Sequence, residues 1–195
     1  MNYNTISFWH PASLISTFFG LGKIPIMPGT FGSIAAYFIL SLKIIIVYFL
    51  GTRVSSINTV FFIFAIGWLI LLIPGTYAAH FYAKRTNKSD PKEIVIDEVI
   101  GQLLTLYITL PFSIQALPSD HDTSYMSISY VISVILIGPF ILFRLFDIIK
   151  PWPIKWCDQN IKGGIGIVLD DIIAALMAGI IFNCIIIILM DKKII

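Results

Sequence analysis

Five of the eleven acidic residues lie beside long apolar segments, where charged side chains are costly. They are Asp97, Glu98, Asp147, Asp170 and Asp171. Mg²⁺ takes oxygen ligands and is commonly held by one or two carboxylates together with a substrate phosphate. If the fold brings these acids together, they would suit a magnesium site that acts on a phosphate. Solubility alone is a weak explanation for so many clustered acids in so apolar a chain.

The first acidic pair, Asp97 and Glu98, comes just before an apolar run. We expect it about one and a half turns into a helix that starts at the sequence Asp90-Pro91-Lys92-Glu93, with Asp90 as the N-cap. A polar stripe continues along one face of that helix: Glu98, Gln102, Thr105 and Thr109. Gly101 would permit a close contact with another helix. The alternative is an acidic pair exposed to water at the membrane surface.

A mixed-charge segment contains Arg144, Asp147 and Lys150 at intervals of three, so the three side chains share a helix face. Arginine suits bidentate contact with phosphate, and lysine supplies a point charge. The alternative is a salt-bridged turn at the membrane surface, anchored by Trp152 and Trp156.

The second acidic pair, Asp170 and Asp171, is expected at the start of the last apolar segment, after a flexible loop over residues 163–166. Acids are also stabilised at a helix N-terminus by the helix dipole, which is a purely structural alternative.

The sequence Pro28-Gly29-Thr30-Phe31-Gly32-Ser33 predicts a helix start whose backbone N–H groups could bind phosphate, with Thr30, Gly32 and Ser33 as candidate contacts. Taken alone, this segment is better explained as an ordinary capped helix start at the membrane surface.

The elements that must position these residues are membrane helices. The chain is 57% hydrophobic and 12% charged, against about 25% charged residues in soluble domains. A spanning helix needs roughly 20 apolar residues. We therefore predict an all-α, integral membrane helical bundle, forming a single domain over residues 1–195, with a short interfacial or re-entrant helix at 12–21. About five spans are expected, at residues 33–50, 57–73, 99–117, 125–143 and 172–190.

With five spans, all of the acidic clusters and nine of the thirteen Lys and Arg residues fall on one side of the membrane. The positive-inside rule makes that side cytoplasmic. Lys43 lies inside the first span and is expected to extend toward the interface. The net charge of +2, without a basic run, argues against nucleic acid as a partner.

Four segments in order resemble the phosphatidylglycerophosphatase A family of bacterial inner-membrane enzymes. They are residues 24–36 (IPIMPGTFGSIAA), 94–102 (IVIDEVIGQ), 143–158 (FRLFDIIKPWPIKWCD) and 163–174 (GGIGIVLDDIIA). The resemblance implies Mg²⁺-dependent hydrolysis of phosphatidylglycerophosphate to phosphatidylglycerol and phosphate at a site that faces the cytoplasm. It also matches the five acids above, with Arg144 and Lys150 as basic positions.

On this basis we expect Asp97, Glu98, Asp170 and Asp171 to bind Mg²⁺, with Asp147 as a further catalytic acid. Glu98 or Asp97 would be the general base that activates water. Arg144, Lys150 and the 30–33 backbone would neutralise the phosphate.

Several alternatives stay open at this stage. An aspartate nucleophile is possible in place of water. Another lipid phosphate, such as phosphatidic acid, is the nearest rival substrate. A cation transporter predicts acids near the membrane midplane, and a non-catalytic scaffold predicts acids that do not meet in space. The oligomeric state is not indicated by the sequence.

Overall fold

The computed structural model describes residues 6–50, 57–116 and 136–192, and over these residues the chain forms α-helices and one 3-10 helix, with no strand. The all-α prediction is confirmed. In chain order the elements are α1 (Pro11–Ser16), η1 (Leu21–Lys23), α2 (Pro28–Leu50), α3 (Ile57–Thr86), α4 (Ile96–Gln115), α6 (Gly138–Ile149), α7 (Ile154–Asn160) and α8 (Gly163–Asp191).

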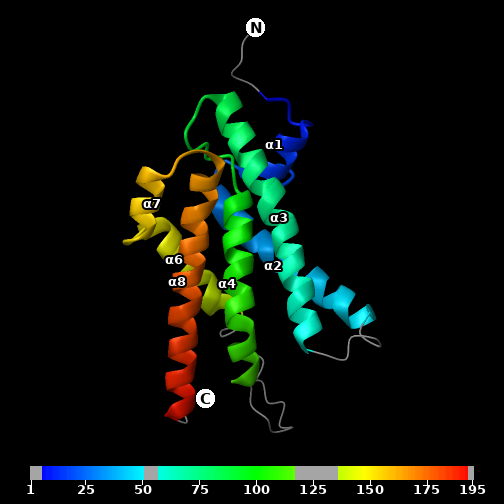
Figure 1. The fold of residues 1–195 in the computed structure, drawn as a ribbon, viewed down its shortest axis with the longest axis vertical. Coiled ribbons are helices and arrows are strands. Elements are labelled where there is room, and N and C mark those ends of the chain that lie inside the picture. The colour runs from blue at the N-terminus through cyan, green and yellow to red at the C-terminus, as the bar shows by residue number, and fades with distance from the viewer. Residues whose placement is uncertain (1–5, 51–56, 117–135, 193–195) are drawn as a thin grey trace.

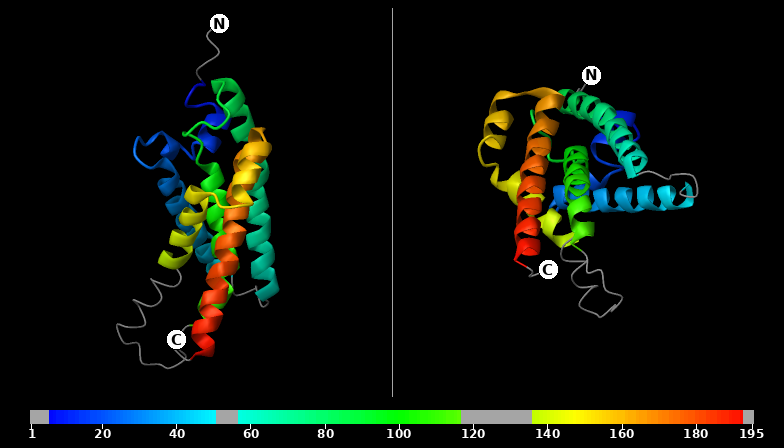
Figure 2. Two further views of the ribbon diagram at one scale, coloured as in Figure 1. Left: turned by 90° about the vertical axis from the view of Figure 1, so that its left-hand side faces the viewer. Right: turned by 60° about the horizontal axis from the view of Figure 1, so that its bottom comes forward.

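Helix α4 lies at the centre of the bundle and packs against α2, α3, α6 and α8 (Figures 1 and 2). Its apolar side chains form much of the core, and Ile100 and Leu103 are completely buried. Gly101 sits at the tightest point of this packing. A Cβ there would lie 2.7 Å from the Phe143 ring and 3.0 Å from the backbone oxygen of Asp171. The predicted close contact at Gly101 is thus confirmed, and it draws α6 and α8 against the acidic end of α4.

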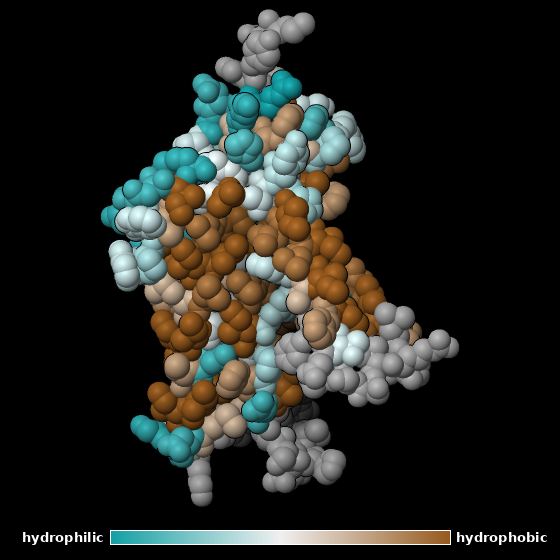
Figure 3. Space-filling view, in the orientation of Figure 1, coloured by the Kyte–Doolittle hydropathy of each residue, from teal (hydrophilic) through white to brown (hydrophobic). Residues whose placement is uncertain are grey.

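Three helices are long and apolar enough to cross a membrane: α2, α3 and α8. Their outward side chains are large hydrophobes, among them Phe62, Ile70 and Ile180. Hydrophobic residues cover much of the middle of the face shown in Figure 3, and hydrophilic residues gather beyond them at the end that carries α1. The structure supports a membrane-embedded bundle, but the expected count of about five spans is not confirmed. Most of the expected span at 125–143 falls outside the described residues.

Helix α8 begins earlier than the sequence suggested. The glycine-rich stretch 163–166, expected as a flexible loop, forms its first turn. The glycines serve close packing: a Cβ on Gly164 would lie 2.2 Å from the backbone oxygen of Thr76, and one on Gly166 would lie 2.0 Å from that of Ile161. Asp170 and Asp171 are therefore about two turns inside the helix instead of at its start. Stabilisation by the dipole at the helix N-terminus, the structural alternative given for these acids, does not apply at that position.

Helix α4 begins later than expected, at Ile96, so Asp97 and Glu98 occupy its first turn. Asp90 does not cap it. The backbone N–H of Val95 instead donates to the Ser16 carbonyl at 2.9 Å, which ties the chain to α1 before the helix starts. The Glu93 side chain does not form the capping contact expected three residues after Asp90, because its carboxylate pairs with Lys88 Nζ at 3.2 Å.

Helix α3 also differs from the expected span at 57–73, because it continues through Pro74 to Thr86. The position after the proline is used for packing: a Cβ on Gly75 would lie 2.9 Å from the Ile96 side chain and 3.0 Å from that of Ile100. This contact with α4 stabilises the extended helix despite the backbone hydrogen bond that Pro74 removes.

The segment around Lys150 reverses the chain. The predicted end of the helix before Pro151 is confirmed, since α6 ends at Ile149 and Lys150 adopts a left-handed conformation with φ of 47°. The chain then returns as α7, which packs against α8. Gly138 and Pro139 lie in the first turn of α6, and most of the expected helix before them lies outside the described residues, so the kink expected at 138–139 stays a prediction.

Two smaller predictions can also be compared. The short helix expected at 12–21 is present as α1, which is only 6 residues long. Lys43 was expected to extend toward the membrane surface. Its ammonium group instead donates a hydrogen bond to the Tyr107 hydroxyl at 2.6 Å, which links α2 to α4.

Candidate active site

A polar cavity of about 550 Å³ lies at the end of the bundle where α4 begins and α6 ends. It is lined by α4, α6, α7, α8, the segment that precedes α4 and the first residue of α2, Pro28. All of the predicted acids line it, together with both predicted basic residues: Asp97, Glu98, Arg144, Asp147, Lys150, Asp170 and Asp171. Three regions that are far apart in the sequence therefore meet in one place.

The acid triad consists of Asp97, Glu98 and Asp171. One carboxylate oxygen from each of the three lies within 4.8 Å of the others. Asp97 and Asp171 are buried, and only 16% of the Glu98 side chain is exposed. Each residue also has a buried oxygen with no hydrogen-bond partner among the described residues: Asp97 Oδ1, Glu98 Oε2 and Asp171 Oδ2.

Three buried carboxylates this close repel one another, and burial adds a large desolvation cost when they are ionised. Buried polar groups normally have partners, so the free oxygens of the acid triad need an explanation. A divalent cation would supply one, because it neutralises the repulsion and takes oxygen ligands. The residues present thus fit a Mg²⁺ site.

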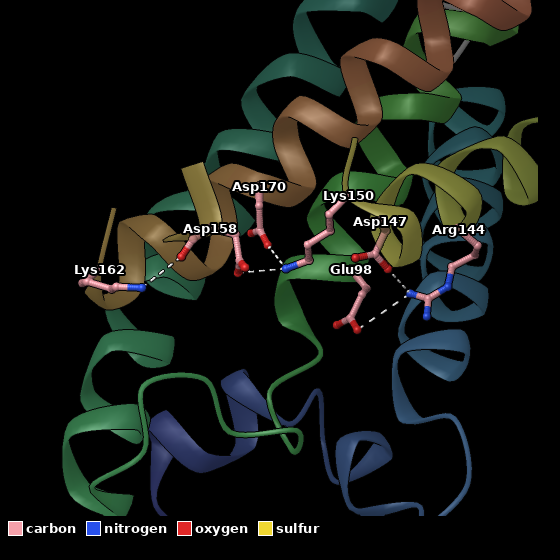
Figure 4. Close-up of polar contacts among 7 residues, drawn as sticks. All are labelled: Glu98, Arg144, Asp147, Lys150, Asp158, Lys162 and Asp170. Atoms are coloured by element: carbon pink, nitrogen blue, oxygen red, sulfur yellow. Dashed lines mark hydrogen bonds and ion pairs between the residues drawn. The ribbon is translucent and has the colours of Figure 1, made fainter. Parts of the chain in front are cut away.

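Arg144 extends from α6 toward Glu98, one member of the acid triad (Figure 4). Its Nη1 lies 2.7 Å from Asp147 Oδ2, one turn further along the same helix, and 3.8 Å from Glu98 Oε1. Its Nε atom is buried and has no hydrogen-bond partner among the described residues. Arg144 is therefore held in place by two carboxylates while part of its guanidinium remains available to an anion in the cavity.

The Lys150 clamp consists of Lys150, Asp158 and Asp170. The Lys150 ammonium donates to Asp170 Oδ2 at 2.5 Å and to Asp158 Oδ1 at 2.9 Å (Figure 4). Burial lowers the pKa of Lys150, but hydrogen bonds and charge from the two aspartates outweigh burial and raise the pKa above its usual range. The ammonium stays charged and joins α6, α7 and α8.

Asp170 and Asp171 are neighbours in the sequence but serve different clusters. Successive residues point about 100° apart around an α-helix, so Asp171 joins the acid triad while Asp170 joins the Lys150 clamp. Asp170 Oδ1 remains buried without a partner among the described residues. A metal-binding role for Asp170 stays a prediction.

The start of α2 lies beside the acid triad. A Cβ on Gly29 would lie 2.0 Å from Glu98 Oε1, and one on Gly32 would lie 2.9 Å from the Val95 backbone oxygen. The buried Ser33 hydroxyl donates back to the Gly29 carbonyl at 3.1 Å. Gly32 and Ser33 therefore serve helix packing, and neither they nor Thr30 are among the residues that line the cavity. Gly32 nevertheless lies against Glu98, because its Cβ would be 3.3 Å from the Glu98 Cβ, and the phosphate contacts expected for the three residues stay a prediction.

The polar stripe below Glu98 is buried. The hydroxyl of Thr105 donates to the Gly101 carbonyl at 3.1 Å, and that of Thr109 donates to the Thr105 carbonyl at 3.0 Å, so both are satisfied within α4. Gln102 is fully buried, and its side-chain amide has no partner among the described residues.

Sequence reasoning missed several charged residues of the cavity, namely Asp90, Lys92, Asp158 and Lys162. Asp158 is the most informative, because it forms half of the Lys150 clamp. The sequence holds one signal for it: the two prolines after Lys150 predict a chain reversal that would return residues 154–160 toward the site.

The chain matches a known protein family over most of its length. The family model for phosphatidylglycerophosphatase A matches residues 14–186. The chain belongs to this family. The match includes α4, α6, α7 and α8, and hence both the acid triad and the Lys150 clamp.

Curated relatives agree with this family. The chain is 34% identical over 175 residues to phosphatidylglycerophosphatase A of Escherichia coli (strain K12), covering 89% of this chain and 81% of the relative. It is 32% identical over 176 residues to phosphatidylglycerophosphatase A of Haemophilus influenzae, covering 90% and 89%. It is also 33% identical over 164 residues, covering 83% and 84%, to a Bacteroides thetaiotaomicron protein named "Putative phosphatidylinositol-3-phosphatase". No solved structure matches the chain.

Proposed function

We propose that this protein hydrolyses phosphatidylglycerophosphate to phosphatidylglycerol and inorganic phosphate, using Mg²⁺ held by the acid triad. The observation that carries the proposal is the meeting of three buried carboxylates with Arg144 in one cavity, in a chain of the phosphatidylglycerophosphatase A family. The named activity of the relatives from Escherichia coli and Haemophilus influenzae supports the headgroup.

The residues of this chain have distinct roles in the proposal. Asp97, Glu98 and Asp171 would hold the metal, and Arg144 would bind the phosphate oxygens through its free guanidinium edge. Asp147 orients Arg144 through their 2.7 Å ion pair. When bound, Mg²⁺ would supply positive charge to the phosphoryl oxygens. Catalysis would then depend mainly on positioning and on stabilisation of developing negative charge.

Proton transfer is assigned to the α4 pair. Glu98 or Asp97 would take the proton from the attacking water, since Glu98 lies 3.8 Å from Arg144 and Asp97 lies beside Glu98 in the acid triad. An attack by an aspartate carboxylate remains the alternative, and rapid-quench detection of an acid-stable or hydroxylamine-sensitive phosphoenzyme would distinguish the two routes.

We assign Lys150 a different role from the phosphate contact expected from the sequence. Both of its short contacts are to carboxylates within the protein, so its main contribution would be to position Asp170 and α7 at the edge of the cavity. Direct contact between Lys150 and phosphate would need the Lys150 clamp to open.

The cavity would face the cytoplasm of a bacterial inner membrane. The basic residues that the sequence assigns to the inner side include Lys84, Arg85, Lys92 and Lys162. Lys92 and Lys162 line the cavity, and Lys84 lines a neighbouring pocket together with Lys162. A cysteine-accessibility experiment in spheroplasts, with a single cysteine at exposed Lys84, would test this orientation.

The test of the proposed function is phosphate release by purified protein from long-chain phosphatidylglycerophosphate, with and without EDTA. Wild-type protein should release phosphate, EDTA should abolish release, and added Mg²⁺ should restore it. Asp191→Asn provides a matched control, because Asp191 is an exposed carboxylate at the opposite end of α8. Full activity of wild-type protein in EDTA would contradict the metal assignment.

A second headgroup is worth testing because of the Bacteroides thetaiotaomicron relative. Phosphatidylinositol 3-phosphate and phosphatidic acid should be assayed beside phosphatidylglycerophosphate at equal surface concentration. The proposal expects the highest kcat/KM for phosphatidylglycerophosphate. The transporter and scaffold alternatives lose support from family membership and from the meeting of the acids.

A further inference from the structure

A second cavity of about 460 Å³ opens between α2 and α6, within the hydrophobic part of the bundle. The two helices pack on the same side of α4 (Figure 2, left). The α2–α6 groove is apolar. Its walls include Ile34, Tyr37 and Phe38 of α2 and Leu136, Ile137 and Phe140 at the start of α6.

The wall formed by α6 leads directly to the candidate active site. Ile137, Phe140, Arg144 and Asp147 are spaced by three and four residues, so they follow one face of the helix. The first two line the α2–α6 groove, and the last two line the polar cavity. By helix rise, Ile137 lies roughly 10 Å from Arg144 along the axis, which fits within one leaflet of a hydrocarbon core about 30 Å thick.

The wall formed by α2 leads to the same place. Ile34 and Phe38 are successive turns of the α2 face that is exposed to the groove. Gly29 lies just above them, against Glu98 Oε1, and a Cβ at Gly29 would also lie 3.0 Å from Arg144 Nη1. Both walls therefore end at the guanidinium that would bind phosphate.

The far end of the α2–α6 groove is held by a polar contact. The Tyr37 hydroxyl donates to the Leu136 carbonyl at 2.6 Å, and the Tyr37 ring lies 6.3 Å from that of Phe140. This link ties α2 to the start of α6, so the two walls keep a fixed separation at the end remote from Arg144.

We propose that the α2–α6 groove holds an acyl chain of the lipid whose phosphate binds at Arg144. This inference rests on the proposed function. The apolar walls match hydrocarbon, and the cationic upper end matches the phosphate of the same molecule. A water-soluble phosphate monoester would leave the groove without an occupant, so the groove selects for a membrane lipid and positions its headgroup at the acids.

A second apolar groove, of about 660 Å³, lies between α3 and α8 and provides the internal control. It is lined by Ile73, Tyr77 and Ile165 among others, and by Lys162, which also lines the polar cavity. Neither Arg144 nor a residue of the acid triad lines it. Lipid contacts the outer faces of any membrane protein, but of these two grooves between described helices it is the α2–α6 groove whose walls lead to Arg144.

Photo-crosslinking tests the location directly. Full-length protein in phosphatidylcholine nanodiscs would be irradiated with phosphatidylglycerophosphate that carries a diazirine in the half of one acyl chain nearer the glycerol, with EDTA present to prevent turnover. The expected label falls on peptides that contain residues 34–41 or 136–140, and excess unlabelled phosphatidylglycerophosphate should remove it. Competable label confined to the α3–α8 groove, or label that no competitor removes, would overturn the proposal.

Kinetics test the consequence. Ile34→Trp and Phe38→Trp would fill the α2–α6 groove, and Ile73→Trp would fill the control groove. The groove variants should lower kcat/KM for a dipalmitoyl substrate by about tenfold or more, while changing that for a dihexanoyl substrate less than about threefold. Retained activity on the short-chain substrate also shows that a variant is folded.

The outcomes separate the two proposals. Equal losses on both substrates, or no loss on either, would overturn the acyl-chain assignment. A loss of kcat/KM in Ile73→Trp as large as in the groove variants would also overturn the acyl-chain assignment. Absence of phosphate release by wild-type protein from both substrates would instead contradict the proposed function, while the crosslinking result would still report on where the lipid binds.

Discussion

The acid triad and the Lys150 clamp lie in the same cavity and use consecutive residues of α8, yet their charges are balanced differently. In the Lys150 clamp, one ammonium group is bonded to two carboxylates. In the acid triad, three carboxylates converge and Arg144 approaches only Glu98, at 3.8 Å. The Lys150 clamp holds a cation of its own that contacts both of its carboxylates, whereas the acid triad has three carboxylates and no cation within it. A cluster of close, buried carboxylates therefore indicates a cation site when the protein places no ammonium or guanidinium group among them.

The largest expected effect comes from removing one charge of the acid triad. Asp97→Asn and Asp171→Asn should each lower kcat for phosphate release by roughly 10²–10³-fold or more, because the charge that stabilises the transition state depends on these ligands. The same substitutions should leave the apparent melting temperature in EDTA unchanged or higher, since each relieves repulsion among buried carboxylates. A large fall in melting temperature without loss of activity would contradict this assignment, because it would mean that the acid triad serves stability and not catalysis.

The Lys150 clamp should respond in the opposite way. Lys150→Met leaves Asp170 buried without its partner and should lower the free energy of unfolding by about 3–5 kcal/mol. The double variant Lys150→Met/Asp170→Asn should recover part of that loss, because the two residues interact directly. Reversible unfolding in mixed micelles would measure both. Additive losses in the double variant would show that the Lys150–Asp170 contact has little energetic weight.

Arg144→Lys sharpens the comparison because it keeps the charge but removes the planar fork. We expect kcat/KM to fall by roughly 10–100-fold, from the loss of charge-assisted hydrogen bonds to phosphate. The melting temperature should change much less than in Lys150→Met. Wild-type kcat/KM in Arg144→Lys would mean that the residue acts as a simple point charge.

The smallest effect is expected from packing. Gly101→Ala places a methyl group 3.0 Å from the Asp171 backbone and should cost about 1–3 kcal/mol of stability. It should also lower activity, because it shifts Asp171 away from the α4 acids. Gly179→Ala is the matched control at the far end of the same helix pair, where a Cβ would lie 2.7 Å from Ile108. Equal losses of activity in Gly101→Ala and Gly179→Ala would show that activity does not depend on the spacing of the acid triad.

The sequence predicts the helical class and the identity of the acids well, because both depend on local composition. Charged residues in an apolar chain are conspicuous, and the order of four segments indicates the family. All five predicted acids line one cavity, although their individual roles stay predictions.

Helix boundaries could not be predicted as well, because tertiary contacts override local signals. Pro74 and the glycines at 163–166 are helix breakers in isolation, but both segments are helical. Close packing of glycine backbones against α3, α4 and the loop before α8 stabilises these helices. The sequence also could not predict that Asp170 and Asp171 belong to two different clusters. That division depends on where α7 returns and on the resulting position of Asp158.

The most direct test of the account is cation binding by the acid triad, measured without turnover. Mn²⁺ would replace Mg²⁺ as the spectroscopic probe, and electron paramagnetic resonance would follow its binding to purified protein in nanodiscs. Wild-type protein and Asp191→Asn should bind Mn²⁺ in competition with Mg²⁺, and Asp97→Asn and Asp171→Asn should each lose this binding. Wild-type affinity for Mn²⁺ in both triad variants would contradict the claim that the acids of α4 and α8 form one metal site.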